Sequence, residues 1–385
     1  MKRSNGTYTT HHAPERAALV GVEIRGNYTD WSLRESLAEL GDLTRAANAE
    51  VVARVSQRLD RPSRTYLGKG KLEELQTLIH DEEIDVVVFD DELAPAQQKA
   101  LEDLLVVKVI DRSTLILDVF AQRARTREGK LQIELAQSEY LLPRLAGQWA
   151  HLERLGGGIG TRGPGEAQIE TDRRLVRSRI SKLKKDLSKV RIQRSEQRQN
   201  RTSSQAAVVS FVGYTNAGKS ALFNRLASGK VTARNQLFST LDTTTRQLYL
   251  PSGEQAILTD TVGFIHKLPA IVVSAFTATL EELEYADLLL HVVDVSHRGS
   301  IAHHDVVEGI LDELGLSAIP RILVLNKFDR VAESPDDPLT DRANQLVAMS
   351  KHSVVTSAEF GWGLDDLRSE ISKVVSMDVP EPASA

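Results

Sequence analysis

The chain has 385 residues, 41% hydrophobic content and a net charge of −5, which is enough length and apolar material for two or three domains with ordinary cores. Its lack of cysteine excludes disulfides, thiolate metal sites and thiol catalysis. No apolar run approaches the roughly 18 residues of a membrane-spanning helix. Residues 1–15 lack the apolar core of a signal peptide, and we expect them to form a disordered tail.

Residues 16–110 alternate between strand and helix patterns. Residues 17–24, 50–55 and 85–89 read as strands, residues 32–45 read as a helix, and a further helix begins near Pro95. This order predicts a small N-terminal α/β domain with a parallel sheet. A Gly-Lys-Gly-Lys turn at residues 68–71 has phosphate-binding composition. It lacks the spacing of a phosphate loop, so we favour a turn that starts a helix.

Residues 111–205 predict a helical subdomain. Apolar residues at helical spacing, such as Ile133, Tyr140 and Leu145, indicate a helical hairpin that buries this stripe. A glycine-rich loop follows at residues 156–165. Because five glycines before Pro164 cost backbone entropy without filling a core, the loop is either a connector or a contact surface. We favour contact with RNA, to which Arg162 and the backbone amides are suited.

Residues 172–201 carry twelve lysines and arginines against three acidic residues, a local charge of +9. The contrast with the chain's overall negative charge favours a cationic helix that contacts an RNA backbone. The alternative is a solvated helix face. Leu175, Ile180, Leu183 and Leu187 give this helix an apolar stripe, so we expect it to pack on the preceding hairpin with its charge outward.

Residues 206–377 begin with a buried strand, a G-x-x-x-x-G-K-S loop and a helix, the context that a phosphate-binding loop requires. Glycines allow close approach of phosphate oxygens to the backbone N–H groups, and the helix N-terminus adds partial positive charge. We predict that Lys219 stabilises the β and γ phosphates and that the Ser220 hydroxyl is a ligand of Mg²⁺. The predicted loop residues are Gly213, Tyr214, Thr215, Asn216, Ala217, Gly218, Lys219 and Ser220.

Three later segments supply what a guanine nucleotide needs, each beside a predicted strand. The first is D-x-x-G, which can hold Mg²⁺ through a water and offer the Gly263 N–H to the γ phosphate. The second places Asp329 to accept from guanine N1–H and its amino group, which adenine lacks. The third offers the Ala358 N–H to guanine O6. The residues are Asp260, Thr261, Val262 and Gly263; Asn326, Lys327, Phe328 and Asp329; and Ser357, Ala358 and Glu359. We therefore predict a GTPase with a mostly parallel sheet.

The second side-chain ligand of Mg²⁺ is expected between the first helix of this domain and the D-x-x-G strand. Residues 238–246 offer four threonines, and spacing does not choose among them. A plain loop or an edge strand is the alternative. The predicted nucleotide contacts in this segment are Phe238, Ser239, Thr240, Leu241 and Asp242.

Phe264 occupies the position after the D-x-x-G glycine, where many small GTPases carry a glutamine that orients the attacking water. Phenylalanine cannot orient a water. We therefore predict slow intrinsic hydrolysis, with the site completed by a partner or another domain. Two pairs of adjacent histidines, His11-His12 and His303-His304, lack a second cluster at metal-ligand spacing, and we expect them to be solvated.

Four segments resemble the HflX family of translation-factor-related GTPases: residues 65–71, 110–145, 155–166 and 260–269. The resemblance spans roughly residues 20–375. It implies a cytoplasmic, bacterial-type GTPase that binds the large ribosomal subunit and its rRNA, with roles in recycling stalled ribosomes or in subunit maturation. It also implies that Thr240 is the second Mg²⁺ ligand. We expect a monomer.

The chain departs from the family pattern in two places. Residues 271–276 lose an acidic residue that the family usually carries after Leu268-Pro269, which leaves the coupling of this segment to a partner open. The last predicted helix, residues 364–375, is followed by a short tail at 378–385 rather than by the extra domain of some relatives. Alternative functions are a GTP-regulated RNA-binding assembly factor and a membrane-associated switch. The absence of lipidation motifs argues against the latter.

Overall fold

The computed structural model describes residues 13–26, 31–61, 63–148, 164–202, 206–227, 238, 244–275, 280 and 282–377. The chain divides into two compact units, Met1–Leu115 and Ile116–Ala385, and the division falls within one helix. The predicted tails at 1–15 and 378–385 lie outside the described residues except for residues 13–15. Among the described residues, no helix combines the length and apolar composition that crossing a bilayer requires.

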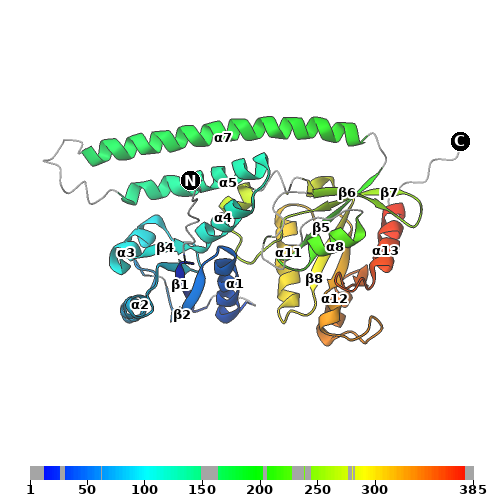
Figure 1. Ribbon diagram of the computed structural model, residues 1–385, viewed down its shortest axis with the longest axis horizontal. Coiled ribbons are helices and arrows are strands. Elements are labelled where there is room, and N and C mark those ends of the chain that lie inside the picture. Colours follow the sequence, from blue (N-terminus) through cyan, green and yellow to red (C-terminus); the bar gives the residue numbers. More distant parts are fainter. Residues whose placement is uncertain are drawn as a thin grey trace, which may run out of the picture. The chain divides into compact units, whose positions relative to one another are not determined.

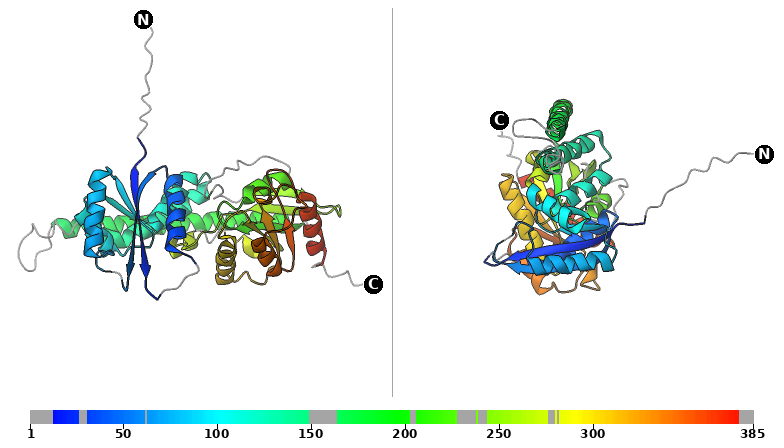
Figure 2. Two further views of the ribbon diagram at one scale, coloured as in Figure 1. Left: turned by 90° about the horizontal axis from the view of Figure 1, so that it is seen from below. Right: turned by 90° about the vertical axis from the view of Figure 1, so that its left-hand side faces the viewer.

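The first unit is a four-stranded parallel sheet in the order β2-β1-β3-β4. Its helices cover both faces (Figure 2). Leu37 of α1 packs against Gly21 on one face, while Leu72 and Leu75 of α2 join the core on the other. The elements are β1 (Arg16–Ile24), α1 (Leu33–Ala46), β2 (Glu50–Leu59), α2 (Lys69–Asp81), β3 (Val86–Phe89), α3 (Pro95–Leu105), β4 (Lys108–Asp111) and α4 (Arg112–Arg123).

Most of these elements agree with the prediction, including α2, which begins at the Gly-Lys-Gly-Lys turn. Helix α1 starts at a capping box: the Ser32 side chain accepts from the Glu35 N–H, and the Glu35 side chain accepts from the Ser32 N–H. The short strand β4 was not predicted. Its four residues are too few to show a period.

The second unit contains a helical hairpin and a six-stranded sheet in the order β10-β9-β8-β5-β7-β6 (Figure 1). All strand pairs are parallel except β6 with β7, so the predicted mostly parallel sheet is confirmed. The hairpin helices are α5 (Arg127–Gln148) and α7 (Pro164–Thr202). The strands are β5 (Ala207–Gly213), β6 (Thr244–Tyr249), β7 (Gln255–Asp260), β8 (Leu288–Asp294), β9 (Arg321–Asn326) and β10 (Ser353–Val355).

The remaining helices are the connections between these strands. They are α8 (Lys219–Leu226), α9 (Ala270–Ala275), η1 (Leu283–Tyr285), α11 (Ser300–Glu313), η2 (Phe328–Arg330), α12 (Asp341–Ala348) and α13 (Leu364–Met377). Helices α8 and α13 pack on one side of the sheet, in a core that includes Phe211, Leu290 and Ile371. A second core joins the other side of β8 and β9 to α12 through Leu325 and Leu346. The carboxyl ends of β5, β7, β8 and β9 therefore meet at one edge of a sheet with both faces covered.

The hairpin is held by apolar and ionic contacts between α5 and α7, which lie side by side (Figure 1). Leu183 and Leu187 of α7 are buried, as are Ile133 and Tyr140 of α5. Arg179 pairs with Glu134, and Lys184 pairs with Glu139 at 2.8 Å. These two basic residues pair with α5 but remain more than half exposed, so the helix presents its charge outward, as expected.

Leu175 was also assigned to the buried stripe, and this assignment was wrong because its side chain is 61% exposed. The glycine-rich loop at 156–165, including Arg162, lies outside the described residues except for the start of α7.

The contrast between Leu183 and Leu175 gives a direct test of the hairpin. Leu183→Ala should lower the stability of the α5–α7 pair by about 2–4 kcal/mol, because a buried leucine loses its transfer free energy and leaves a cavity. The measurement is amide hydrogen exchange of residues 127–148 and 164–202. Leu175→Ala is the control and should change protection by less than about 0.5 kcal/mol. Equal effects of the two variants would contradict this packing.

Candidate nucleotide-binding site

The phosphate loop leaves β5 at Gly213 and enters α8 after Gly218, as predicted from its spacing. Gly213 has φ +146°, and a Cβ there would lie 2.3 Å from the Val292 carbonyl oxygen. Gly218 has φ +101°, and a Cβ there would lie 2.2 Å from Asn326 Nδ2. No other residue fits at either position, since both the backbone conformation and the available space exclude a side chain.

Lys219 is 6% exposed and lies inside the curve of this loop. Its Nζ donates to the backbone oxygens of Gly213 and Tyr214, both at 2.9 Å. These two bonds fix the ammonium, and its third N–H remains for a phosphate oxygen. Burial lowers the pKa of Lys219 to about 8, although the nearby Asp260 acts in the opposite direction.

Ser220 and Asp260 bring two hard oxygen ligands together beside the lysine. The Ser220 hydroxyl donates to Asp260 Oδ2 at 2.6 Å, and both residues are buried. Thr261, the next residue of the D-x-x-G segment, donates to the Phe211 backbone oxygen at 2.5 Å. This bond anchors the segment to β5. A hydroxyl and a carboxylate are ligands that suit Mg²⁺.

Residues 263–266 pair with the phosphate loop. The Thr215 N–H donates to the Phe264 oxygen at 2.7 Å, and the Phe264 N–H donates to the Gly213 oxygen at 3.1 Å. The His266 N–H donates to the Tyr214 hydroxyl at 2.8 Å. Gly263 lies so close to the loop that a Cβ on it would be 2.9 Å from Lys219 Nζ. The segment therefore lies next to the place where a γ phosphate would contact Lys219. Phe264 itself is buried.

The predicted base-recognition segments also meet at this edge of the sheet. Asn326 is buried and joins its own segment to the phosphate loop and to the segment after β10. Its Nδ2 donates to the Ala217 oxygen at 2.8 Å. Its Oδ1 accepts from the Ala358 N–H at 3.2 Å and from the Thr356 hydroxyl at 3.3 Å. Ser357 donates to Asp329 Oδ1 at 2.5 Å, which orients the carboxylate. Phe328 is buried in the core beneath this segment.

The comparisons with known proteins agree with this geometry. Three family models match consecutive segments: "GTP-binding GTPase N-terminal" at residues 34–121, "GTP-binding GTPase Middle Region" at 123–201 and "50S ribosome-binding GTPase" at 208–327. The GTPase HflX of Caldanaerobacter subterraneus is 52% identical over 93% of this chain and 80% of its own. That of Escherichia coli K12 is 42% identical over 97% and 86%. The chain belongs to the HflX family of GTPases.

A solved relative shares the fold. The crystal structure of SsGBP in complex with GDP is 26% identical, covers 94% of this chain and 99% of its own, and superposes with a TM-score of 0.52. As a member of the HflX family, the chain is an enzyme that hydrolyses GTP.

Several predicted positions in the segment before β6 lie outside the described residues: Ser239, Thr240, Leu241 and Asp242. Phe238 is described. It is 2% exposed, and its ring meets the Phe120 ring of α4 edge to face, with centroids 4.4 Å apart. Phe238 therefore contacts the helical part of the second unit.

Sequence reasoning missed three residues that shape the site from a distance in the chain. Arg225 of α8 donates to the backbone oxygens of Ala358, at 2.8 Å, and Glu359, which holds the loop after β10 in place. Asp294 pairs with Lys327 at 2.8 Å. The His303 ring stacks on Tyr214, with centroids 3.9 Å apart and planes within 2°. No local spacing predicts these contacts, because each joins elements that only the sheet brings together.

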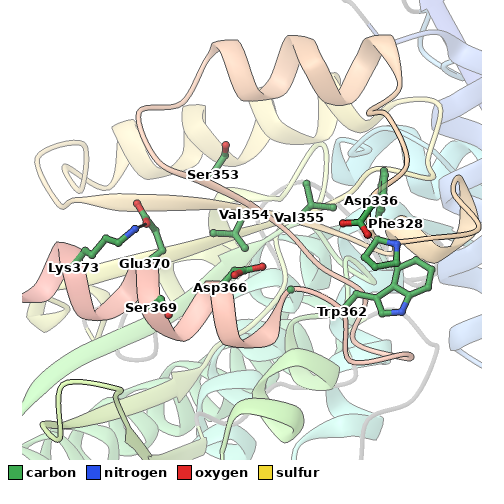
Figure 3. Close-up of a pocket in the computed structure, with 12 residues that line it drawn as sticks. Phe328, Asp336, Ser353, Val354, Val355, Trp362, Asp366, Ser369, Glu370 and Lys373 are labelled. Carbon is green, nitrogen blue, oxygen red and sulfur yellow. Dashed lines mark hydrogen bonds and ion pairs between the residues drawn. The ribbon is translucent and has the colours of Figure 1, made fainter.

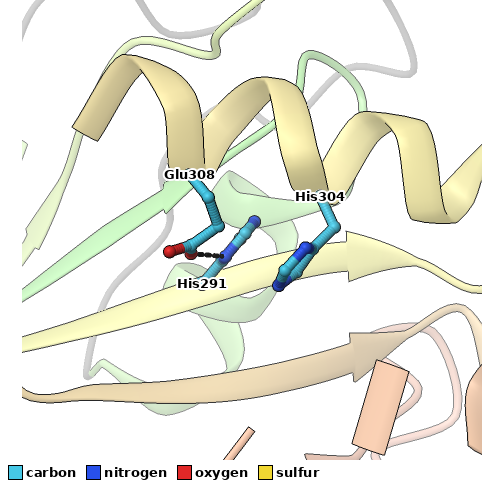
Figure 4. Close-up of side chains that lie close together, drawn as sticks. All are labelled: His291, His304 and Glu308. Atoms are coloured by element: carbon cyan, nitrogen blue, oxygen red, sulfur yellow. Dashed lines mark hydrogen bonds and ion pairs between the residues drawn. The ribbon is translucent and has the colours of Figure 1, made fainter. Parts of the chain in front are cut away.

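The expectation that His303 and His304 are solvated was wrong. Burial, helped by the neighbouring His297, lowers the pKa of His303 to about 3, so the ring is neutral at ordinary pH. His304 stacks on the buried His291, and these rings lie with Glu308 in one cluster (Figure 4). The pair His11-His12 lies outside the described residues.

The cluster of His291, His304 and Glu308 has ligand atoms within 4.8 Å of one another, but its geometry does not suit a metal ion. The two imidazole planes are within 11° of parallel, with centroids 4.9 Å apart, so their in-plane lone pairs do not converge. Glu308 accepts from His291 at 2.8 Å and pairs with Arg321. The arrangement is a chain of hydrogen bonds between β8, α11 and β9.

A separate pocket of about 370 Å³ lies between β10, α13 and the segment after η2 (Figure 3). Its walls include Trp362, Asp336 and Asp366. It shares only Phe328 with the predicted nucleotide contacts. The pocket therefore backs the base-recognition segment rather than forming part of the phosphate site.

The depressed pKa of Lys219 predicts a pH dependence of nucleotide binding. Above about pH 8 the free protein loses this positive charge, and binding a polyphosphate requires proton uptake. GDP affinity should fall about five- to tenfold between about pH 7 and about pH 8.8. Calorimetric titrations at about pH 8.5, in two buffers with different ionisation enthalpies, measure the proton uptake directly. Affinity that stays constant over this range, without proton uptake, would contradict the assignment.

Proposed function

We propose that this chain binds GTP and GDP with Mg²⁺ at the edge of the six-stranded sheet, and that its nucleotide state controls association with the large ribosomal subunit and its rRNA during ribosome recycling or rescue. The observation that carries the proposal is the meeting of the phosphate loop, the Ser220–Asp260 pair and the Asn326–Ala358 loops at one edge. The match of residues 208–327 to a family described as "50S ribosome-binding GTPase" supports the partner.

The proposed contacts follow from where the side chains lie. Loop residues 213–220 hold the phosphates, with Lys219 as the stabilising charge and Ser220 as a ligand of Mg²⁺. Asp260 holds the ion through water. Residues 326–329 and 357–359 read the base, and Asp329 makes the choice of guanine. Thr240 is the proposed second ligand of Mg²⁺ from the resemblance alone.

Slow intrinsic hydrolysis is part of the proposal. Phe264 offers no group that could orient the attacking water, and its backbone is bonded on both sides to the phosphate loop. A γ phosphate that contacts both Lys219 and the Gly263 N–H needs this segment to move away from the lysine. A ribosomal surface that moves residues 263–266 outward would make room for the γ phosphate beside Lys219. The same surface could supply the group that orients the attacking water.

The path from nucleotide to partner runs through the helical part of the same unit. Phe238, beside the segment expected to hold Mg²⁺, packs on Phe120 of α4. Helix α9 directly follows residues 260–269 and packs on α5. Helix α9 thus rests on the hairpin directly, while Phe238 rests on α4, which leads into α5 at Arg127. A change at the phosphates therefore has one direct route to α5 and a second that passes through α4.

Helix α7 is the proposed rRNA-binding surface. Arg174, Lys182 and Lys185 are exposed, and within the described part of the chain no ion pair involves them. At 3.6 residues per turn they share a face with Lys189 that is opposite the docking residues Leu183 and Leu187. A row of exposed cations on one face suits a phosphate backbone, although Lys189 also pairs with Asp186.

The experiment is to measure GTP hydrolysis by the purified chain alone and with isolated large ribosomal subunits. We expect slow turnover alone and stimulation of at least about 100-fold with subunits, as for partner-completed GTPases. Lys219→Ala should remove activity in both conditions.

A high rate in isolation, or intact GTP binding without stimulation, would contradict the proposal as stated. The second of these outcomes favours the alternative function, a GTP-regulated assembly factor that acts on precursor particles. The exposed cationic face of α7 supports that alternative equally.

A further inference from the structure

Lys327, the second residue of the N-K-F-D segment, has an unusual backbone. Its φ is +61°, a left-handed conformation that non-glycine residues rarely adopt, and it immediately precedes η2. Its side chain is only 14% exposed. A lysine that combines this backbone with a mostly buried ammonium needs a fixed partner at the end of its side chain.

That partner is Asp294, the last residue of β8. Asp294 Oδ2 lies 2.8 Å from Lys327 Nζ, and the Asp294 side chain is equally buried. The other carboxylate oxygen accepts from the Ser296 N–H at 3.0 Å and from the Ser296 hydroxyl at 2.5 Å. Burial alone would raise the pKa of Asp294, but Lys327 and Ser296 together lower it. The carboxylate is therefore charged, and the bonds from Ser296 hold it in place independently of the lysine.

The ion pair determines where the lysine stem lies. Strand β8 pairs with β9 so that Asp294 is opposite Asn326, the residue before Lys327. From there the stem passes the phosphate loop, since a Cβ on Gly218 would lie 3.9 Å from Lys327 Cε. The four methylenes of the Lys327 side chain thus extend past the phosphate loop to Asp294. They form a fixed apolar surface beside Asp329, the residue that reads the base.

We propose that Asp294 is a positioning residue for the base: by holding the Lys327 ammonium, it keeps the lysine stem flat against the guanine ring and slows release of the nucleotide. It touches no part of the nucleotide itself. Without the carboxylate, the ammonium has no charged partner and turns toward water, and the base loses one of its packing surfaces. The inference depends on the proposed base site.

The test is the rate of release of a fluorescent GDP in the full chain. Asp294→Asn keeps the shape of the side chain and removes its charge, and it should release GDP about 5- to 20-fold faster, the effect of losing a charge-assisted bond in a partly buried place. Asp365→Asn is the control. It removes the same charge from an ion pair of similar length, 2.7 Å to Arg368, at an exposed position on α13, and its release rate should equal that of the unmodified chain.

Lys327→Met separates positioning from a general loss of structure. Methionine keeps an apolar stem without the ammonium, so Asp294→Asn should have no further effect in that background. Release from Asp294→Asn at the unmodified rate would overturn the inference, and so would an acceleration that persists in Lys327→Met. Asp329→Ala tests the base site separately: if it leaves GDP binding intact, the proposed site itself fails.

Discussion

The nucleotide site depends on one buried side chain, the carboxamide of Asn326. It uses both ends at once, donating to the phosphate loop at Ala217 and accepting from the loop after β10 at Ala358. The close approach it requires leaves no space for a side chain at Gly218. Because a buried amide that loses a partner incurs the full desolvation cost, the phosphate-binding and base-recognition loops stay in one arrangement relative to each other.

Around this fixed centre, the segments expected to respond to the γ phosphate are held by contacts of their own. Hydrogen bonds attach Phe264 to Gly213 and Thr215 of the loop, and His266 to Tyr214. Helix α9, which follows them, rests on α5. Residues 271–275 of the departure from the family pattern lie in this helix, where Val272 is buried and Ser274 exposed. The acidic residue missing here is therefore not replaced by another charge within the described part of α9.

Much of this arrangement could be predicted from the sequence, because a phosphate loop is a local feature. The spacing from Gly213 to Ser220 determines a strand, a turn and a helix, and the apolar runs before Asp260 and Asn326 identify parallel strands whose ends must meet. The contacts of Arg225, Asp294 and His303 could not be predicted in this way. Each joins residues that are more than 30 positions apart or lie on neighbouring strands, and their partners are determined by the order of the sheet. Leu175 and the His303-His304 pair were wrongly assigned for the same reason: burial depends on which element covers a residue.

In the proposed function, the phosphate site and the hairpin of α5 and α7 respond together to the nucleotide. Hydrogen exchange of the full chain, compared between GDP and a non-hydrolysable GTP analogue, tests it most directly. We expect the protection of residues 260–275 and of α5 to change in the same titration, and we expect Phe120→Ala to weaken the response of α5 without loss of nucleotide binding. A response confined to residues 213–220 and 260–266, with α5 and α7 unchanged, would contradict it.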